Sequence, residues 1–160
     1  MHTKRAIVMV TIVISLIWGI PHAKAVDYDV TNCYSGTVTI LFSSEKLTVL
    51  SYEYKGICTS NIADKTFDNA TLHCVGITRI VGKEVSSFGN CKYQIPDGSI
   101  EIVEFDGKNR EGTWKTIYGT GKLEGMEGGG LWKAITAGKP IAPGTFQECN
   151  RGTGKFTLPR

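Results

Sequence analysis

Residues 71–91 read Thr-Leu-His-Cys-Val-Gly-Ile-Thr-Arg-Ile-Val-Gly-Lys-Glu-Val-Ser-Ser-Phe-Gly-Asn-Cys, and this stretch indicates the fold class. Residues 71–81 have the composition of a β-strand. Gly82-Lys83 predicts a two-residue hairpin turn, because glycine suits the first central position of a type II′ turn. Opposed residue numbers then sum to 165, which places Cys74 directly opposite Cys91.

The N-terminus has the layout of a secretory signal peptide. Lys4 and Arg5 precede an uncharged apolar run over residues 6–20, and the small-x-small triplet Ala23-Lys24-Ala25 follows. This pattern predicts cleavage after Ala25, and the apolar run is shorter than the roughly 20 residues that span a bilayer. We therefore expect a signal peptide at residues 1–25, a single domain at residues 26–160, and a periplasmic or secreted protein. An uncleaved membrane anchor is the alternative.

Removal of the signal changes the charge of the protein. The chain has 18 Lys and Arg against 15 Asp and Glu, and three of the basic residues, but no acidic one, lie within residues 1–25. The mature chain therefore carries 15 of each and has a net charge of zero. Overall charge gives no reason to expect a nucleic-acid partner, or a membrane partner after signal cleavage.

Five cysteines remain in the mature chain: Cys33, Cys58, Cys74, Cys91 and Cys149. Exported proteins fold where disulfides persist, so two bridges and one free thiol are expected, and the sequence allows 15 such arrangements. The hairpin register favours Cys74–Cys91, provided that no bulge interrupts residues 86–90. Cys33 and Cys149 lie near the two ends of the mature chain and would bridge if these ends meet at a barrel seam, which would leave Cys58 free.

Short strands are also expected on both sides of the hairpin. Residues 37–42 alternate as a half-buried strand does, and residues 47–55 are predicted to return with Leu50, Tyr52 and Tyr54 on one face. The other predicted strands are residues 92–95, 100–106, 113–118, 145–149 and 155–158. A bulge is expected within residues 100–106, where the apolar face shifts. Glycines between these runs are typical of turns.

About eight short strands in sequence order predict an all-β fold, a small antiparallel up-and-down barrel that is calycin-like in outline. A β-sandwich is the alternative.

A glycine-rich segment follows residues 113–118. The pattern Gly119-Thr120-Gly121-x-Leu123-x-Gly125-x-x-Gly128 resembles a segment of the allene oxide cyclase and dirigent-like β-barrels. With Gly112-Thr113-Trp114 and Gly144-Thr145-Phe146-Gln147, the mature chain also resembles an uncharacterised family of exported proteobacterial proteins. The first resemblance implies an eight-stranded barrel with an apolar interior and carries over no catalytic residue. The second implies export and no particular activity.

Catalytic patterns are weak in this sequence. There is no G-x-S-x-G elbow, and His73, the one histidine of the mature chain, is expected on the surface or rim. Glu53, Glu101 and Glu104 are interpreted as solvent-exposed strand residues rather than as a carboxylate pair. No CxxC or HxxxH spacing occurs, so neither a metal site nor a cofactor is expected.

The aromatic residues are the best candidates for a binding site. An eight-stranded barrel either fills its interior or holds one small ligand. The side chains expected to line such a cavity are Trp114, Tyr118, Tyr52, Tyr54 and Trp132. The sequence thus suggests an exported barrel that binds a small apolar or aromatic molecule. The alternatives are an enzyme of cyclase or isomerase type in the same barrel, and a structural or interaction module with a filled core. The oligomeric state is left open.

Overall fold

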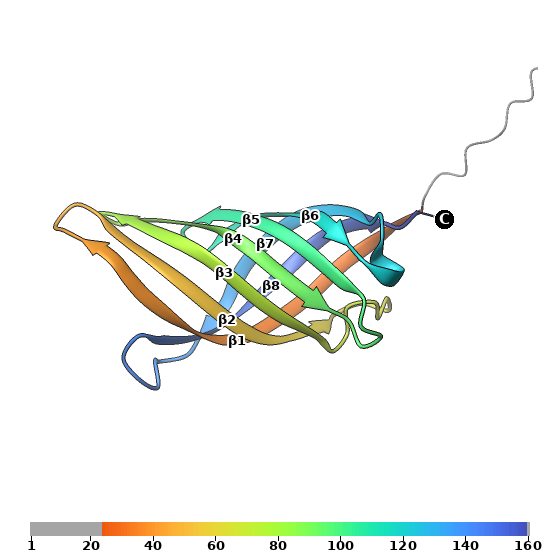
Figure 1. The fold of residues 1–160 in the computed structure, drawn as a ribbon, viewed down its shortest axis with the longest axis horizontal. Helices are drawn as coiled ribbons and strands as arrows, with labels where there is room; N and C mark the ends of the chain where they lie inside the picture. The colour runs from red at the N-terminus through yellow and green to blue at the C-terminus, as the bar shows by residue number, and fades with distance from the viewer. Residues whose placement is uncertain (1–23, 160) are drawn as a thin grey trace, which may run out of the picture.

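The computed structural model describes residues 24–159, which form one closed antiparallel β-barrel (Figure 1). The strands are β1 (Ala25–Ser43), β2 (Thr48–Ser60), β3 (Ala70–Val81), β4 (Glu84–Gln94), β5 (Ile100–Lys108), β6 (Glu111–Gly119), β7 (Glu127–Ala137) and β8 (Thr145–Thr157). Each strand pairs with the next in sequence, and β8 pairs with β1. The predicted up-and-down barrel is confirmed, and the sandwich alternative is wrong. The predicted signal peptide lies outside the described residues except for Lys24 and Ala25, where β1 begins.

The β3–β4 hairpin has the expected register. Val81 pairs with Glu84 and Cys74 with Cys91, and Gly82 has a φ of +60°. The prediction of disulfide bonds is confirmed, because Cys74 is bonded to Cys91 across this hairpin.

The second disulfide lies where the barrel closes. Cys33 of β1 pairs in register with Cys149 of β8 and is bonded to it, while Cys58 is a buried free thiol. Two disulfides are typical of proteins that fold in an oxidising compartment.

Several strands are longer than the sequence pattern predicts. β1 starts 12 residues before the expected strand at residue 37, and β8 runs through residues 150–154, where a turn was expected. β7 forms where no strand was predicted. The errors in β7 and β8 share a cause, because their glycines were interpreted as turn residues although they lie within strands.

Strand glycines pair with the large aromatic side chains of the interior. Gly36 is the register partner of both Tyr54 and Phe146, and a Cβ at Gly36 would lie 2.6 Å from the Tyr54 Cβ and 2.9 Å from the Phe146 ring. Gly76 faces Tyr52 and Gly130 faces Trp114 in the same way. The glycines therefore provide the space in which the aromatic rings lie across a neighbouring strand.

The predicted bulge exists, but it lies on a different strand. The β5–β6 register shifts between Ile102, opposite Tyr118, and Val103, opposite Thr116, so that the extra residue is Ile117 of β6. β5 itself keeps its alternation. The shift changes which side chains of β6 point inward, with consequences for the site described below.

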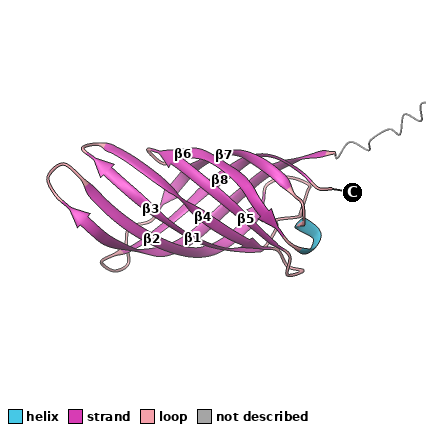
Figure 2. Cartoon of the chain, turned by 45° about the horizontal axis from the view of Figure 1, so that its top comes forward, coloured by secondary structure: helices cyan, strands magenta, loops and turns pink. Residues whose placement is uncertain are grey.

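The two ends of the barrel differ. The β2–β3 and β4–β5 loops and the short 3-10 helix η1 (Gly121–Leu123) cover one end, where four apolar side chains are buried: Phe67, Ile95, Leu123 and Met126. Figure 2 shows η1 at this end, beside the C-terminus. The opposite end carries the β1–β2, β3–β4, β5–β6 and β7–β8 connections. We refer to these as the closed end and the hairpin end. Within the described residues, no helix has the length and apolarity needed to cross a bilayer.

Candidate ligand cavity

The hairpin half of the barrel encloses a cavity of about 240 Å³. All eight strands contribute lining side chains, most of them aromatic or aliphatic. Tyr28, Tyr93 and Trp114 form its base, and the rim includes Asn109 and Arg110 of the β5–β6 turn. The buried side chains of the closed end lie below this base and do not line the cavity. A small molecule would therefore enter from the hairpin end.

Four of the five predicted ligand residues line this cavity: Tyr52, Tyr54, Trp114 and Trp132. Tyr54 stacks on Tyr34, with ring centroids 4.1 Å apart, and on Tyr52 at 5.9 Å. Tyr118 is the exception, and its assignment is wrong. The bulge at Ile117 reverses the alternation of β6, so that Tyr118 points outward and is 61% exposed.

The two indoles are held by backbone hydrogen bonds. Nε1 of Trp114 donates to the Thr153 carbonyl at 3.2 Å, and Nε1 of Trp132 donates to the Asp106 carbonyl at 3.0 Å. Both N–H groups are thus satisfied by the protein. The rings line the cavity in fixed orientations and offer apolar surface to a ligand.

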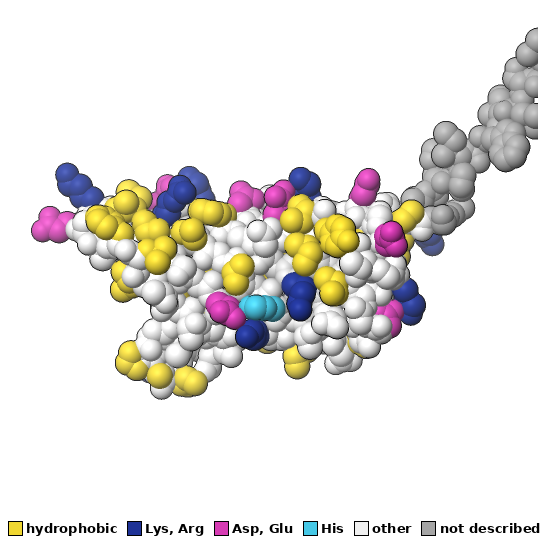
Figure 3. Space-filling model, viewed as in Figure 1, with side chains coloured by type: hydrophobic (Ala, Val, Ile, Leu, Met, Phe, Trp, Pro, Cys, Tyr) yellow, Lys and Arg dark blue, Asp and Glu magenta, His cyan; other side chains and the backbone are white. Residues whose placement is uncertain are grey.

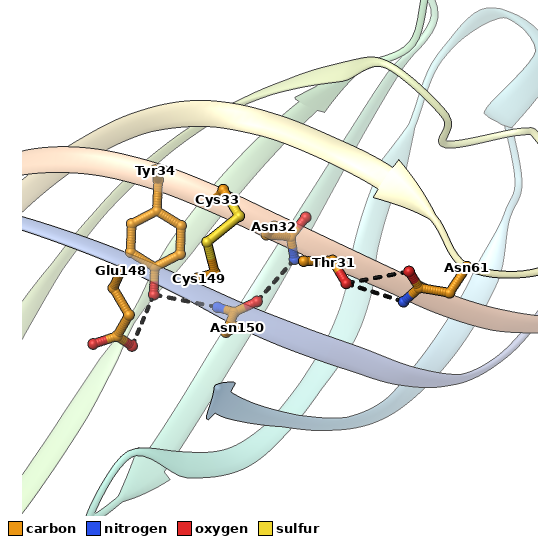
Figure 4. Close-up of a disulfide and its surroundings, with 8 residues drawn as sticks. All are labelled: Thr31, Asn32, Cys33, Tyr34, Asn61, Glu148, Cys149 and Asn150. Atoms are coloured by element: carbon orange, nitrogen blue, oxygen red, sulfur yellow. Dashed lines mark hydrogen bonds between the residues drawn. A yellow bond between two sulfur atoms is a disulfide. The ribbon is translucent and has the colours of Figure 1, made fainter. Parts of the chain in front are cut away.

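One wall of the cavity is polar. β1 and β8 contribute a chain of hydrogen bonds, drawn in Figure 4, that connects Glu148, Tyr34, Asn150 and Asn32. The Tyr34 hydroxyl donates to Glu148 Oε1 at 3.1 Å and accepts from Asn150 Nδ2 at 3.3 Å. Asn32 Nδ2 donates to Asn150 Oδ1 at 3.0 Å, and Asn32 Oδ1 is buried without a partner among the described residues.

Arg110 fixes the direction of this chain of hydrogen bonds. Its guanidinium lies 3.0 Å from Glu148 Oε2, so Glu148 is a paired carboxylate that only accepts. Tyr34 must then donate to Glu148, which orients the amide of Asn150 and, through it, that of Asn32. Arg110 has a φ of +76°, an uncommon conformation for a residue with a side chain, and its carbonyl accepts the Ala134 N–H at 2.9 Å.

Tyrosine side chains in and near the cavity are neutral phenols. Burial raises the pKa of Tyr52 and, together with the nearby Glu148 carboxylate, that of Tyr34 above the ordinary value. Burial likewise raises the pKa of Tyr28, Tyr54 and Tyr93. These hydroxyls therefore act as hydrogen-bond groups and not as ionised bases near neutral pH.

Glu101 was expected to be exposed, and this expectation is wrong. Its side chain points inward beneath the cavity base and is 0% exposed, because β5 alternates regularly and the bulge lies on β6. Oε1 accepts a hydrogen bond from Thr116 Oγ1 at 2.6 Å, while Oε2 has no partner among the described residues. Burial raises the pKa of Glu101 to about 7, and the Thr116 hydrogen bond opposes this shift.

The other chemical candidates do not form a reactive site. Glu53 lies on the outer surface, 2.9 Å from His73 and 3.2 Å from Lys55, and Glu104 pairs with Lys115 at 3.0 Å. Burial raises the pKa of the Cys58 thiol to about 12, and Glu101 adds to the shift. No group of three or more potential metal ligands occurs within residues 24–159.

The polar wall was not predicted from the sequence. Asn32 and Tyr34 lie in the part of β1 that was not predicted as a strand, and Asn150 lies where a turn was predicted. A signal was nevertheless present, since Tyr28, Val30, Asn32 and Tyr34 occupy alternate positions as inward-facing strand residues do. An asparagine in such a series indicates a buried polar group that needs a partner.

Comparisons with known proteins give a likeness of fold. No family model and no curated protein matches this chain. Two solved structures that resemble it are the pterocarpan synthase dirigent proteins GePTS1 and PsPTS1, each 12% identical over 86% of this chain. The alignments cover 94% and 97% of those chains, with TM-scores of 0.51 and 0.49 respectively. The likeness to GePTS1 supports the resemblance to dirigent-like barrels at the level of the eight-stranded fold, and the chain is similar to that protein in architecture.

Proposed function

We propose that this protein is an exported binding protein that holds a small apolar or aromatic molecule inside its barrel. The observation that carries the proposal is the preformed cavity of about 240 Å³, open toward the hairpin end and lined by aromatic side chains from several strands. Ligand sites are typically concave and mostly apolar, with a few placed polar groups. The wall formed by β1 and β8 supplies those polar groups.

The volume sets the size of the ligand. An apolar cavity of about 150 Å³ accommodates benzene. A cavity of about 240 Å³ therefore suits one substituted ring or two fused rings. Tyr34 and Asn150 favour a molecule with a polar edge turned toward β1 and β8, and the aromatic side chains favour a flat body.

Export is part of the same proposal. The predicted signal peptide and the two disulfides support a periplasmic or secreted protein, related to the exported proteobacterial proteins that share its glycine-containing segments. We expect the exported chain to begin at Val26, which intact-mass measurement of the secreted or periplasmic protein will test. A mass that includes residues 1–25 would contradict cleavage.

Intrinsic fluorescence tests the binding proposal directly. Of the three tryptophans, Trp18 lies in the predicted signal, so the mature chain contains only Trp114 and Trp132, and both line the cavity. All tryptophan emission of the mature protein therefore reports on this site. Titration with 1-naphthol and naphthalene is expected to change the emission in a saturable way.

A matched pair of variants locates the effect. Val85→Phe places a larger side chain in the cavity, whereas Val75→Phe enlarges a side chain on the outer face of β3 that is 50% exposed. V85F is expected to weaken binding of both probes, and V75F is expected to bind them as the parent does. Equal effects of the two variants, or no saturable change with the parent protein, would contradict the proposal.

One observation favours a second candidate, an enzyme of cyclase or isomerase type. Glu101 provides an inward carboxyl group whose Oε2 has no partner among the described residues, directly below the cavity base. Glu101→Gln separates the two functions. Probe affinity is expected to be unchanged in E101Q in either case. Only an enzyme that uses Glu101 would also show turnover of a substrate in the parent protein and lose that turnover in E101Q. The cavity argues against the third alternative, a module with a filled core.

A further inference from the structure

The connections at the two ends of the barrel carry opposite charge. At the hairpin end, residues 44–47, 82–83, 109–110 and 138–144 contain four basic side chains and one acidic one: Lys46, Lys83, Arg110, Lys139 and Glu45. At the closed end, residues 61–69, 95–99 and 120–126 contain two basic side chains, Lys65 and Lys122, and four acidic ones, Asp64, Asp68, Asp97 and Glu124. A mature chain with zero net charge is thus polarised along the barrel axis.

Most of the positive charge at the hairpin end is free of ion pairs. Arg110 is paired with Glu148 inside the mouth, as described above. Lys46, Lys83 and Lys139 are exposed and form no ion pair with any described residue. Two acidic strand residues next to these connections are already neutralised, since Glu84 pairs with Lys108 at 3.0 Å and Glu111 with Lys133 at 3.3 Å.

The same end exposes large apolar side chains. Ile40, Leu41 and Phe42 follow one another near the tip of the β1–β2 hairpin and are 64%, 58% and 53% exposed. Val81 at the tip of β3 is 58% exposed, and Ile141 in the β7–β8 loop is 80% exposed. Figure 3 shows hydrophobic side chains next to charged ones at this end of the molecule, on the left.

The apolar hairpin tip extends beyond the closed wall of the barrel. β1 pairs with β8 only as far as Thr37, whereas its pairing with β2 continues to Ser43. Residues 39–43 therefore form a free strand edge on the side of β8, while β2 remains paired with β3 as far as Thr48, and none of residues 39–43 belongs to the buried core. Exposed apolar residues beside unpaired lysines are the combination by which peripheral proteins bind anionic bilayers, with the apolar groups entering the interface and the lysines attracted to the headgroups.

We propose that the hairpin end docks on the surface of an anionic lipid bilayer, which places the mouth of the cavity against the lipid. The inference rests on the proposed function, because it gives the source of the ligand: a small apolar molecule would pass between the bilayer and the cavity without crossing water. The absence of net charge had suggested no membrane partner, but the separation of charge along the barrel supports one. The acidic closed end faces away from the membrane in this arrangement.

Vesicle flotation tests the proposal with the mature protein. The protein is expected to float with vesicles of phosphatidylglycerol and phosphatidylcholine mixed equally, to float less as salt is raised, and to stay unbound with phosphatidylcholine alone. The variant K46Q/K83Q/K139Q is expected to bind the mixed vesicles roughly a hundredfold more weakly, because each lysine near an anionic surface contributes about a fivefold factor.

A second pair of variants tests the apolar contact. L41D/F42D is expected to lose vesicle binding, while Leu131→Asp, which changes a side chain 62% exposed on the outer wall, is expected to keep it. All of these positions are exposed, so thermal melts of the variants should match that of the parent. Loss of binding in L131D to the same extent, binding unaffected by the three lysine changes, or no flotation of the parent would overturn the proposal.

Further measurements separate this proposal from others. Probe titration in solution, followed by tryptophan emission, tests the cavity alone, so a protein that binds 1-naphthol but not vesicles refutes docking and leaves the binding function intact. A protein that floats but binds no probe refutes the binding function instead. Light scattering of the mature chain that reveals a dimer abolished by L41D/F42D would assign the hairpin end to a second copy and overturn membrane docking.

Discussion

At the scale of single residues, Glu101 and the polar wall are the positions where the interior departs from an apolar core. A buried carboxyl is tolerated when it is neutral or well hydrogen-bonded, and Glu101 has one hydrogen bond, from Thr116, for two oxygens. Asn150 satisfies more of the same constraint, because its amide oxygen and nitrogen are both hydrogen-bonded, whereas Asn32 has one hydrogen bond and an unpartnered Oδ1.

Glu101 makes stability depend on pH. Its pKa is about 7 in the folded protein and is expected to be near the ordinary value of 4.5 when unfolded, so the folded state binds more protons between these values. The free energy of unfolding should therefore fall as pH rises from about 4.5 to about 7, by roughly 3 kcal/mol from this group. Urea unfolding across this range will measure the slope.

The variant E101Q is expected to lose that slope and to be more stable than the parent at pH 8. Glu53→Gln provides the control, because the Glu53 carboxyl is on the surface and its pKa is lowered by Lys55 and His73. Parallel pH profiles for E101Q and the parent protein would show that Glu101 does not titrate in this range.

The polar wall predicts an order of stability. Asn150→Leu removes the middle of the chain of hydrogen bonds and leaves Asn32 Nδ2 without its acceptor, whereas Asn32→Leu removes the end residue together with its unpartnered Oδ1. N150L is expected to lose about 1–3 kcal/mol, and N32L clearly less. Chemical denaturation gives the free energy of unfolding of both variants. An equal loss, or a larger loss in N32L, would mean that Asn150 is not the central member of the chain of hydrogen bonds.

At the scale of strands, the repeated pairing of an inward glycine with an inward aromatic residue sets the interior shape. The barrel class could be predicted from the number and order of the strands, but several strand boundaries could not, because glycines within strands resemble turn residues in sequence. The β3–β4 hairpin was predictable because its turn chemistry and its alternation agree. β7 and β8 were predicted incompletely because Gly128, Gly130, Gly152 and Gly154 lower strand propensity locally, and only the aromatic partner on a neighbouring strand explains their presence.

The candidate site was predictable to a similar degree. Strand alternation was sufficient for Tyr52 and Tyr54, and it failed at Tyr118 and Glu101 because a single extra residue, Ile117, reverses the faces of one strand relative to the next. No local pattern indicates on which strand of a pair a bulge falls. Its position depends on the packing of both strands.

Gly36→Ala tests the aromatic–glycine pairing. The new methyl group would collide with the Tyr54 Cβ, the Phe146 ring and the Glu53 carbonyl, so the variant is expected to lose about 1–3 kcal/mol of stability and to alter probe binding. Gly138→Ala is the matched control, because its methyl group would lie 3.2 Å from the flexible end of Gln147 in an exposed loop. Thermal unfolding of both variants gives the comparison, and equal stability would mean that Gly36 is not required for packing.

At the scale of the whole molecule, the cavity opens along the barrel axis, and the charge of the connections changes sign along the same axis. The base of the cavity rests on the packed closed end, which includes Phe67 and Leu123, and the mouth opens among the basic connections. A barrel of this kind separates its tasks: the closed end and the two disulfides hold the fold, and the hairpin end is free to bind. At the hairpin end, vesicle flotation examines docking and tryptophan emission examines the cavity, each independently of the other.

The bond between Cys33 and Cys149 has one more consequence. It joins positions 116 residues apart, so the backbone and this bond together form a covalent ring that contains all seven connections between the strands and excludes only the two chain ends. A protease that cuts once in any loop between these cysteines would therefore produce two polypeptide fragments that remain joined by the Cys33–Cys149 disulfide. Such a nicked protein is expected to run as a single species on a denaturing gel without reductant and as two fragments after reduction. Its tryptophan emission is expected to stay unchanged until the disulfide is reduced.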